Sequence, residues 1–114
     1  MYIGAFSRLA GTSIKTIRYY ESIGLLPEPA RDGRYRVYDD TYVETVRQIR
    51  LAQSLGFTLK QIQSMCEGEN IKRGLPRKVI EAAVAKRQSE ITEQLAELQR
   101  QNEALEQLKT QLNC

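Results

Sequence analysis

Apolar residues recur at helical spacing along most of this chain, and glycines separate the helical segments. A short helix is expected over residues 5–10, and Gly11 suits a tight turn after it. Ser13 or Thr12 can cap a second helix, which Gly24 ends. Two short helices around a glycine turn predict a helix-turn-helix, whose second helix would enter the major groove of DNA.

The second helix carries basic and aromatic side chains on one face. Lys15, Arg18 and Tyr19 lie at positions i, i+3 and i+4, and Tyr20 follows directly. A charged helix face is commonly just solvated, and tyrosines can also be core residues. The helix taken alone therefore leaves DNA contact and plain solvation as open alternatives.

A β-hairpin is expected over residues 30–38. The Asp-Gly pair at 32–33 predicts a type I′ turn, which needs positive φ at both central residues. Strand alternation then places Arg34 and Arg36 on one face and Tyr35 on the other. Such an arginine face suits phosphate contacts, so the hairpin is interpreted as a wing. The helix, the wing and the short spacing between them together favour DNA binding.

Two more helices are expected before the chain becomes polar and glycine-containing. Asp39, Asp40 or Thr41 can cap the first of them. Thr58 and Gln61 predict a capping box at the start of the second. The polar stretch that follows is interpreted as a linker.

The last segment has no glycine or proline after Pro76 and predicts one helix about 55 Å long at ~1.5 Å per residue. Its apolar residues follow an a/d heptad pattern, with one asparagine in the seam. The seam consists of Val84, Ile91, Leu95, Leu98, Asn102, Leu105 and Leu112. The expected organisation is a winged helix-turn-helix domain at 1–68, a linker at 69–75, a dimerisation helix at 76–112 and a C-terminal end at 113–114.

A single helix cannot bury such a stripe alone, so a homodimer is expected, which would also match a palindromic operator. The alternative is a helix that folds back on its own domain, although charged flanks make the stripe narrow for that. The fold class expected is mainly α, with a winged helix-turn-helix followed by a long dimerisation helix.

The net charge of +3 becomes informative only through its distribution. Residues 8–36 hold twice as many basic as acidic side chains, whereas residues 76–114 hold equal numbers. No apolar run is long enough to span a membrane and no leader is visible, so a cytoplasmic protein is expected. The absence of histidine disfavours an enzyme, because no convincing nucleophile–base pair can be assembled.

The chain resembles the MerR family of bacterial transcriptional regulators in the segments IGAFSRLAGTSIKTIRYYESIGLLPEPAR, YRVYDD and IRLAQSLGFTLKQI. The resemblance implies an antiparallel coiled-coil dimer with a DNA-binding head at each end. It implies operators inside promoters with an overlong spacer, which the protein bends and untwists for RNA polymerase. The predicted function is therefore a sequence-specific regulator that binds a palindromic promoter operator as a homodimer and distorts the spacer.

By position, the resemblance implies recognition-helix contacts by Lys15 and Arg18 and a phosphate contact by Tyr20. It implies wing contacts by Arg31, Tyr35 and Arg36. Arg34 stands where relatives often have glycine, and the wing turn looks one residue short. The candidate DNA-binding residues are Lys15, Arg18, Tyr19, Tyr20, Arg31, Arg34, Tyr35 and Arg36.

Two cysteines, Cys66 and Cys114, are candidate sensor thiols. One thiolate per site is too few for a metal, so neither a metal site nor a cofactor is expected, and the effector is unassigned. Cys66 is more typical of a packing residue, although nearby Lys72 and Arg73 could lower its pKa. Two rival functions stay open, namely an architectural or excisionase-like DNA binder without an effector and a coiled-coil adaptor.

Overall fold

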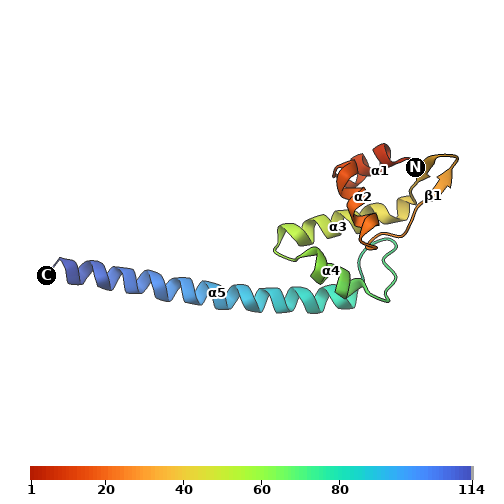
Figure 1. The fold of residues 1–114 in the computed structure, drawn as a ribbon. Coiled ribbons are helices and arrows are strands. Elements are labelled where there is room, and N and C mark those ends of the chain that lie inside the picture. The colour runs from red at the N-terminus through yellow and green to blue at the C-terminus, as the bar shows by residue number, and fades with distance from the viewer. Residues whose placement is uncertain (114) are drawn as a thin grey trace. The chain divides into compact units, whose positions relative to one another are not determined.

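The computed structural model describes residues 1–113, which form two compact units. The first unit is Met1–Val79 and the second begins at Ile80. In chain order the elements are α1 (Ile3–Ala10), α2 (Ile14–Ser22), β1 (Ala30–Asp32), β2 (Tyr35–Val37), the 3-10 turn η1 (Asp40–Tyr42), α3 (Val43–Ser54), α4 (Leu59–Cys66) and α5 (Arg77–Leu112) (Figure 1). The fold is mainly helical, with a winged helix-turn-helix followed by a long helix, as expected.

The helix-turn-helix forms at the predicted place. Gly11 adopts the left-handed conformation at φ 71° and closes α1, which begins at Ile3, two residues earlier than expected. Ser13 is the cap of α2, because its hydroxyl accepts a hydrogen bond from the Thr16 N–H at 3.1 Å. Arg47 of α3 donates from Nε and Nη2 to the carbonyl of Leu9 at 2.9 and 2.6 Å, which satisfies the C-terminus of α1.

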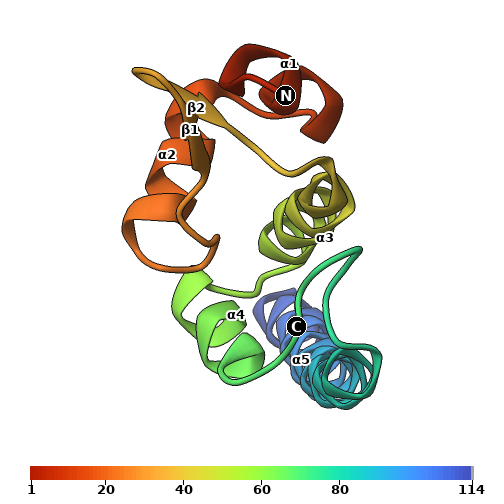
Figure 2. The same cartoon turned by 90° about the vertical axis from the view of Figure 1, so that its right-hand side faces the viewer.

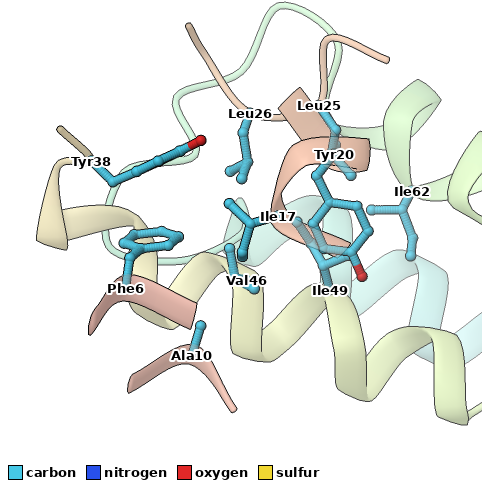
Figure 3. Close-up of a cluster of buried hydrophobic side chains, with 10 residues drawn as sticks. All are labelled: Phe6, Ala10, Ile17, Tyr20, Leu25, Leu26, Tyr38, Val46, Ile49 and Ile62. Carbon is cyan, nitrogen blue, oxygen red and sulfur yellow. The ribbon is translucent and has the colours of Figure 1, made fainter. Parts of the chain in front are cut away.

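One hydrophobic core holds the first unit together (Figure 3). Each fully buried aliphatic or aromatic side chain contributes about 1.5–3 kcal/mol of burial free energy. Phe6 and Tyr38 stack with ring centroids 5.0 Å apart, which joins α1 to the end of the hairpin. The core consists of Phe6, Ala10, Ile17, Tyr20, Leu25, Leu26, Tyr38, Val46, Ile49 and Ile62.

The hairpin forms, but its turn differs from the prediction. Asp32 pairs with Tyr35, so the two loop residues are Gly33 and Arg34 and not Asp32 and Gly33. Positive φ occurs at Gly33 (61°) and not at Arg34, which excludes type I′ and matches the requirement of type II′. Arg34 therefore lies in the turn, and its predicted alternation with Tyr35 along a strand is wrong.

The N-terminal residues extend the hairpin (Figure 2 shows β1 and β2 with the N-terminus). Tyr2 forms an antiparallel bridge with Val37, and the Tyr38 N–H donates to the Met1 carbonyl at 2.7 Å. The hairpin thus gains a third backbone partner, which matters because an isolated two-stranded hairpin is only marginally stable in water.

The third helix starts differently from the prediction, whereas the fourth starts as predicted. Asp39 caps η1 by accepting from the Thr41 N–H at 3.0 Å, and α3 then begins without a side-chain cap. Thr58 and Gln61 form the predicted capping box of α4, with mutual hydrogen bonds of 2.9 and 3.1 Å.

The stretch after α4 is tied to α3 by buried hydrogen bonds. Thr45 is fully buried, and its hydroxyl donates to the carbonyl of Ile71 and accepts from the Gly74 N–H at 3.0 Å. The Gln48 side-chain carbonyl accepts from the Leu75 N–H at 2.7 Å. This segment is therefore held against α3 within the first unit, although its composition is that of a linker.

Candidate nucleic-acid interface

Three of the candidate residues are exposed together on α2. Lys15, Arg18 and Tyr19 lie on the solvent side, and Tyr19 exposes 53% of its surface. Ile17 and Tyr20 of the same helix point into the core (Figure 3). This division follows from helical periodicity, because residues three and four apart share a face. The exposed face combines two cations and an aromatic ring, which suits contacts with base edges and phosphates.

Tyr20 lies in the core, 1% exposed. Its hydroxyl donates to the Gln53 side-chain carbonyl at 2.5 Å, and burial raises the pKa of Tyr20. A phosphate contact through Tyr20 would require this hydroxyl to leave its partner and reach solvent. In the conformation described here, Tyr20 supports the helix from behind.

The wing presents a second exposed set. Arg31, Arg34 and Tyr35 are all exposed, and Tyr35 is 62% accessible. Tyr2 braces this surface, since its ring lies 5.8 Å from that of Tyr35 and its hydroxyl donates to Asp32 at 2.8 Å. The wing therefore exposes two arginines and an aromatic ring, a composition suited to phosphate contacts.

The remaining wing arginine faces the helix. Arg36 Nε lies 3.4 Å from the carboxylate of Glu21, on the last turn of α2. The Tyr38 hydroxyl donates to the other oxygen of the same carboxylate at 3.0 Å. Burial, followed by the hydrogen bond to Glu21, raises the pKa of Tyr38 to about 12. Glu21 therefore joins the helix to the wing.

The predicted seam of α5 is exposed along the single chain. Its exposed fractions run from 39% at Ile91 to 77% at Leu112. Asn102 is also exposed, and ion pairs such as Arg100–Glu97 (2.5 Å) flank the stripe. These exposed leucines form the apolar stripe that the heptad pattern predicts.

The structure describes one of the two candidate sensor thiols. Cys66 is half-buried on α4, and burial, with a smaller effect of Glu69, raises the pKa of its thiol. Both effects oppose the lowering that Lys72 and Arg73 could cause, because desolvation disfavours the thiolate, and this favours the packing role for Cys66. Cys114 lies outside the described residues. Within residues 1–113 no group of three or more histidine, cysteine, aspartate or glutamate side chains is placed to hold a metal ion.

Sequence reasoning missed the residues that support this surface from behind. Glu21, Tyr2 and Arg47 each contact a partner between 15 and 38 residues away in the chain. Local spacing carries no signal for such pairs. The one available hint was that Glu21 lies three residues after Arg18, within the reach of a helical ion pair.

This arrangement, a helix-turn-helix with a wing and a long helix, is that of a DNA-binding regulator. Residues 1–69 match the family described as MerR HTH family regulatory protein, and residues 43–113 match the one described as MerR, DNA binding. The chain belongs to the MerR HTH family of regulatory proteins.

Individual relatives agree with this assignment. The HTH-type transcriptional regulator HmrR of Sinorhizobium medicae is 47% identical over 66 residues, which cover 57% of this chain and 45% of that protein. The mercuric resistance operon regulatory protein of Pseudomonas fluorescens is 33% identical over 107 residues, covering 93% and 72%. The match to HmrR thus spans less than half of that relative's length.

Solved structures show the same fold. The lead(II) complex of the transcription regulator PbrR691 from Ralstonia metallidurans has a TM-score of 0.55 at 31% identity, covering 89% of this chain and 81% of that one. A MerR-family regulator from Bacillus cereus has a TM-score of 0.59 at 28% identity, covering 92% and 74%. Among residues 1–113, no helix is both long and apolar enough to cross a membrane.

Proposed function

We propose that this protein binds a palindromic promoter operator as a homodimer and distorts the promoter spacer for RNA polymerase. The observation that carries the proposal is the exposed basic surface of α2 and the wing in a chain of the MerR family. Lys15 and Arg18 are the proposed base and phosphate contacts of the helix. Arg31, Arg34 and Tyr35 are the proposed wing contacts, and Arg36 joins them if its pairing with Glu21 leaves donors free.

The exposed seam of α5 supports the dimer. Apolar side chains at heptad spacing are buried only when a second helix packs against them. An antiparallel pair of such helices would carry one DNA-binding unit at each end, so each unit could reach one half-site of a palindrome. Asn102 within the seam would specify the register at some cost in stability.

Distortion of the spacer is the proposed means of regulation. A dimer that contacts two half-sites through rigid heads can offset the energy of bending DNA by the contacts that the bend allows.

DNase I footprinting and gel shifts on the promoter upstream of the protein's own gene, at two salt concentrations, test this proposal. We expect a protected palindrome between the two promoter elements, hypersensitive bases at its centre, and affinity that falls steeply with salt. Arg18→Ala should weaken binding by about 1–3 kcal/mol. Lys86→Ala, which removes an exposed cation of α5, is the matched control and should leave binding unchanged.

Promoter-dependent transcription separates the proposal from an architectural role. A regulator changes transcript output, whereas an architectural or excisionase-like protein binds and bends DNA without doing so. Binding without any change in transcription would support the architectural function. No binding to this promoter or to genomic fragments would favour a coiled-coil adaptor instead.

A further inference from the structure

A three-residue cluster joins the recognition helix to the wing. The carboxylate of Glu21 lies 3.4 Å from Arg36 Nε and accepts the Tyr38 hydroxyl at 3.0 Å, so each of its oxygens has a partner. The Glu21 side chain is 13% exposed and that of Arg36 is 32% exposed. Tyr38 is 5% exposed and stacks on Phe6 in the core (Figure 3). The carboxylate is thus anchored from the core side and contacts the cation on the solvent side.

This geometry holds one edge of the Arg36 guanidinium and leaves the opposite edge without a partner among the described residues. Glu21 engages Nε of Arg36, and the two Nη groups have no hydrogen-bond partner within residues 1–113. Arg18 lies one helical turn before Glu21. The positive charge of Arg18 lowers the pKa of the Tyr38 hydroxyl, although the larger effects of burial and Glu21 raise it. The Tyr38 hydroxyl, which anchors the carboxylate, therefore feels the charges of two arginines that are proposed to contact DNA.

The spacing of helix and wing matters because both must reach one duplex together. Two linked contact elements gain affinity only when their geometry allows simultaneous engagement. A mobile arginine, by contrast, can contact any phosphate, and it adds affinity without sequence information. A partly buried carboxylate near the backbone of DNA also repels phosphates unless the arginine remains between them.

We propose that Glu21 is a positioning residue for sequence-specific DNA recognition. It holds Arg36 and the wing in fixed relation to α2, so that the free Nη groups of Arg36 reach only phosphates in the matching geometry. This inference rests on the proposed function. It assigns to Glu21 a share of the discrimination between operator and unrelated DNA, with no contact of its own to a base.

The experiment measures the affinities of the full-length wild type, Glu21→Gln, Arg36→Ala and the double variant. Each is titrated with the footprinted operator and with an unrelated duplex of equal length. We expect Glu21→Gln to lower the ratio of operator to unrelated affinity about tenfold, while affinity for the unrelated duplex rises. In the Arg36→Ala background the same change should have little further effect, because Glu21 acts through Arg36. A loss of folding would lower both affinities and leave the ratio unchanged.

Two further variants complete the test. Glu67→Gln removes the same charge at an exposed site at the end of α4 and should leave the ratio unchanged. Tyr38→Phe keeps the ring and removes the anchor of Glu21, and Tyr38 is too buried to meet DNA directly. We expect it to lower the ratio about threefold, and it serves as the probe if Glu21→Gln does not fold.

The outcomes distinguish the inference from the proposed function. If the wild type does not prefer the operator, the proposed function fails and the inference fails with it. If the wild type discriminates and both Glu21→Gln and Tyr38→Phe discriminate equally well, the role of Glu21 alone is overturned. The role of Glu21 is also overturned if Glu21→Gln lowers the affinity ratio as much in the Arg36→Ala background as in the wild type.

Discussion

The hydroxyl of Thr45 on α3 accepts a hydrogen bond from the backbone N–H of Gly74 at 3.0 Å, although 29 residues separate the two. The same hydroxyl donates to the carbonyl of Ile71. One buried side chain therefore satisfies two backbone groups of the segment that leads into α5. The composition of that segment is typical of a linker, and this contact is what orders it.

Replacing Thr45 by valine should destabilise the protein by about 1–3 kcal/mol, because valine keeps the shape and leaves buried backbone groups unpaired. Urea unfolding of Thr45→Val measures the change in free energy. Thr45→Ser retains the hydroxyl and should cost clearly less. A larger loss in Thr45→Ser than in Thr45→Val would contradict this prediction, because it would show that packing of the methyl group, and not the hydrogen bonds, stabilises this segment.

Two glycines should respond oppositely to alanine. Gly74 has φ 131°, and a Cβ there would lie 3.1 Å from the Gln48 side chain, so Gly74→Ala should cost about 1–3 kcal/mol. Gly4 lies within α1, and its added Cβ would be 3.6 Å from Arg8, an ordinary contact. Gly4→Ala should therefore stabilise by about 0.5–1 kcal/mol. Thermal unfolding of both variants compares them, and a shift in the same direction would contradict this prediction.

The adjacent tyrosines of α2 should separate stability from DNA binding. Tyr20→Phe removes a buried hydrogen bond to Gln53 and should lower stability by about 1 kcal/mol without a comparable loss of DNA affinity. Tyr19→Ala removes a ring that is 53% exposed, so it should weaken DNA binding while stability changes little. Unfolding and gel-shift measurements on both variants make the comparison. A large DNA-binding defect in folded Tyr20→Phe would instead support a phosphate contact by that hydroxyl.

A charge in the seam of α5 should disrupt the proposed dimer. Leu98 is 61% exposed in the single chain, and Leu98→Glu would place a carboxylate at a buried position of the assembled pair. We expect dimer affinity to fall more than about tenfold by sedimentation, with operator affinity falling alongside. Gln99→Glu adds the same charge one residue outside the seam and is the control. A dimer that survives Leu98→Glu intact would show that another surface holds the subunits together.

Cys66 should react slowly with thiol reagents near neutral pH. Burial and Glu69 raise the pKa of its thiol, so the reactive thiolate appears only at higher pH than for an ordinary cysteine. In a Cys114→Ser variant, the rate of reaction with a disulfide reagent should rise with pH. The midpoint of this rise should lie at a higher pH than in the urea-unfolded protein. Faster reaction of the folded protein at pH 7 would revive the sensor hypothesis.

Sequence alone determined the features that depend on local interactions. Contacts between residues three or four apart predicted the helical segments, the Thr58–Gln61 capping box and the heptads of α5. They left the cap of α2 open between Thr12 and Ser13, and the structure uses Ser13. The resemblance to the MerR family was also visible in short, contiguous segments, and family matches over residues 1–69 and 43–113 confirm it.

The tertiary structure decided what depends on distant partners. The wing turn is centred on Gly33 and Arg34 because strand pairing fixes Asp32 opposite Tyr35, which overrides the local preference of the Asp-Gly pair. Helical periodicity puts the adjacent Tyr19 and Tyr20 on different faces of α2. The position of α3 decided which face is covered, so that Tyr20 contacts Gln53 and Tyr19 is exposed. The pairing of Arg36 with Glu21 likewise needed the hairpin to fold back on α2, since no pattern within either segment encodes a contact across 15 residues.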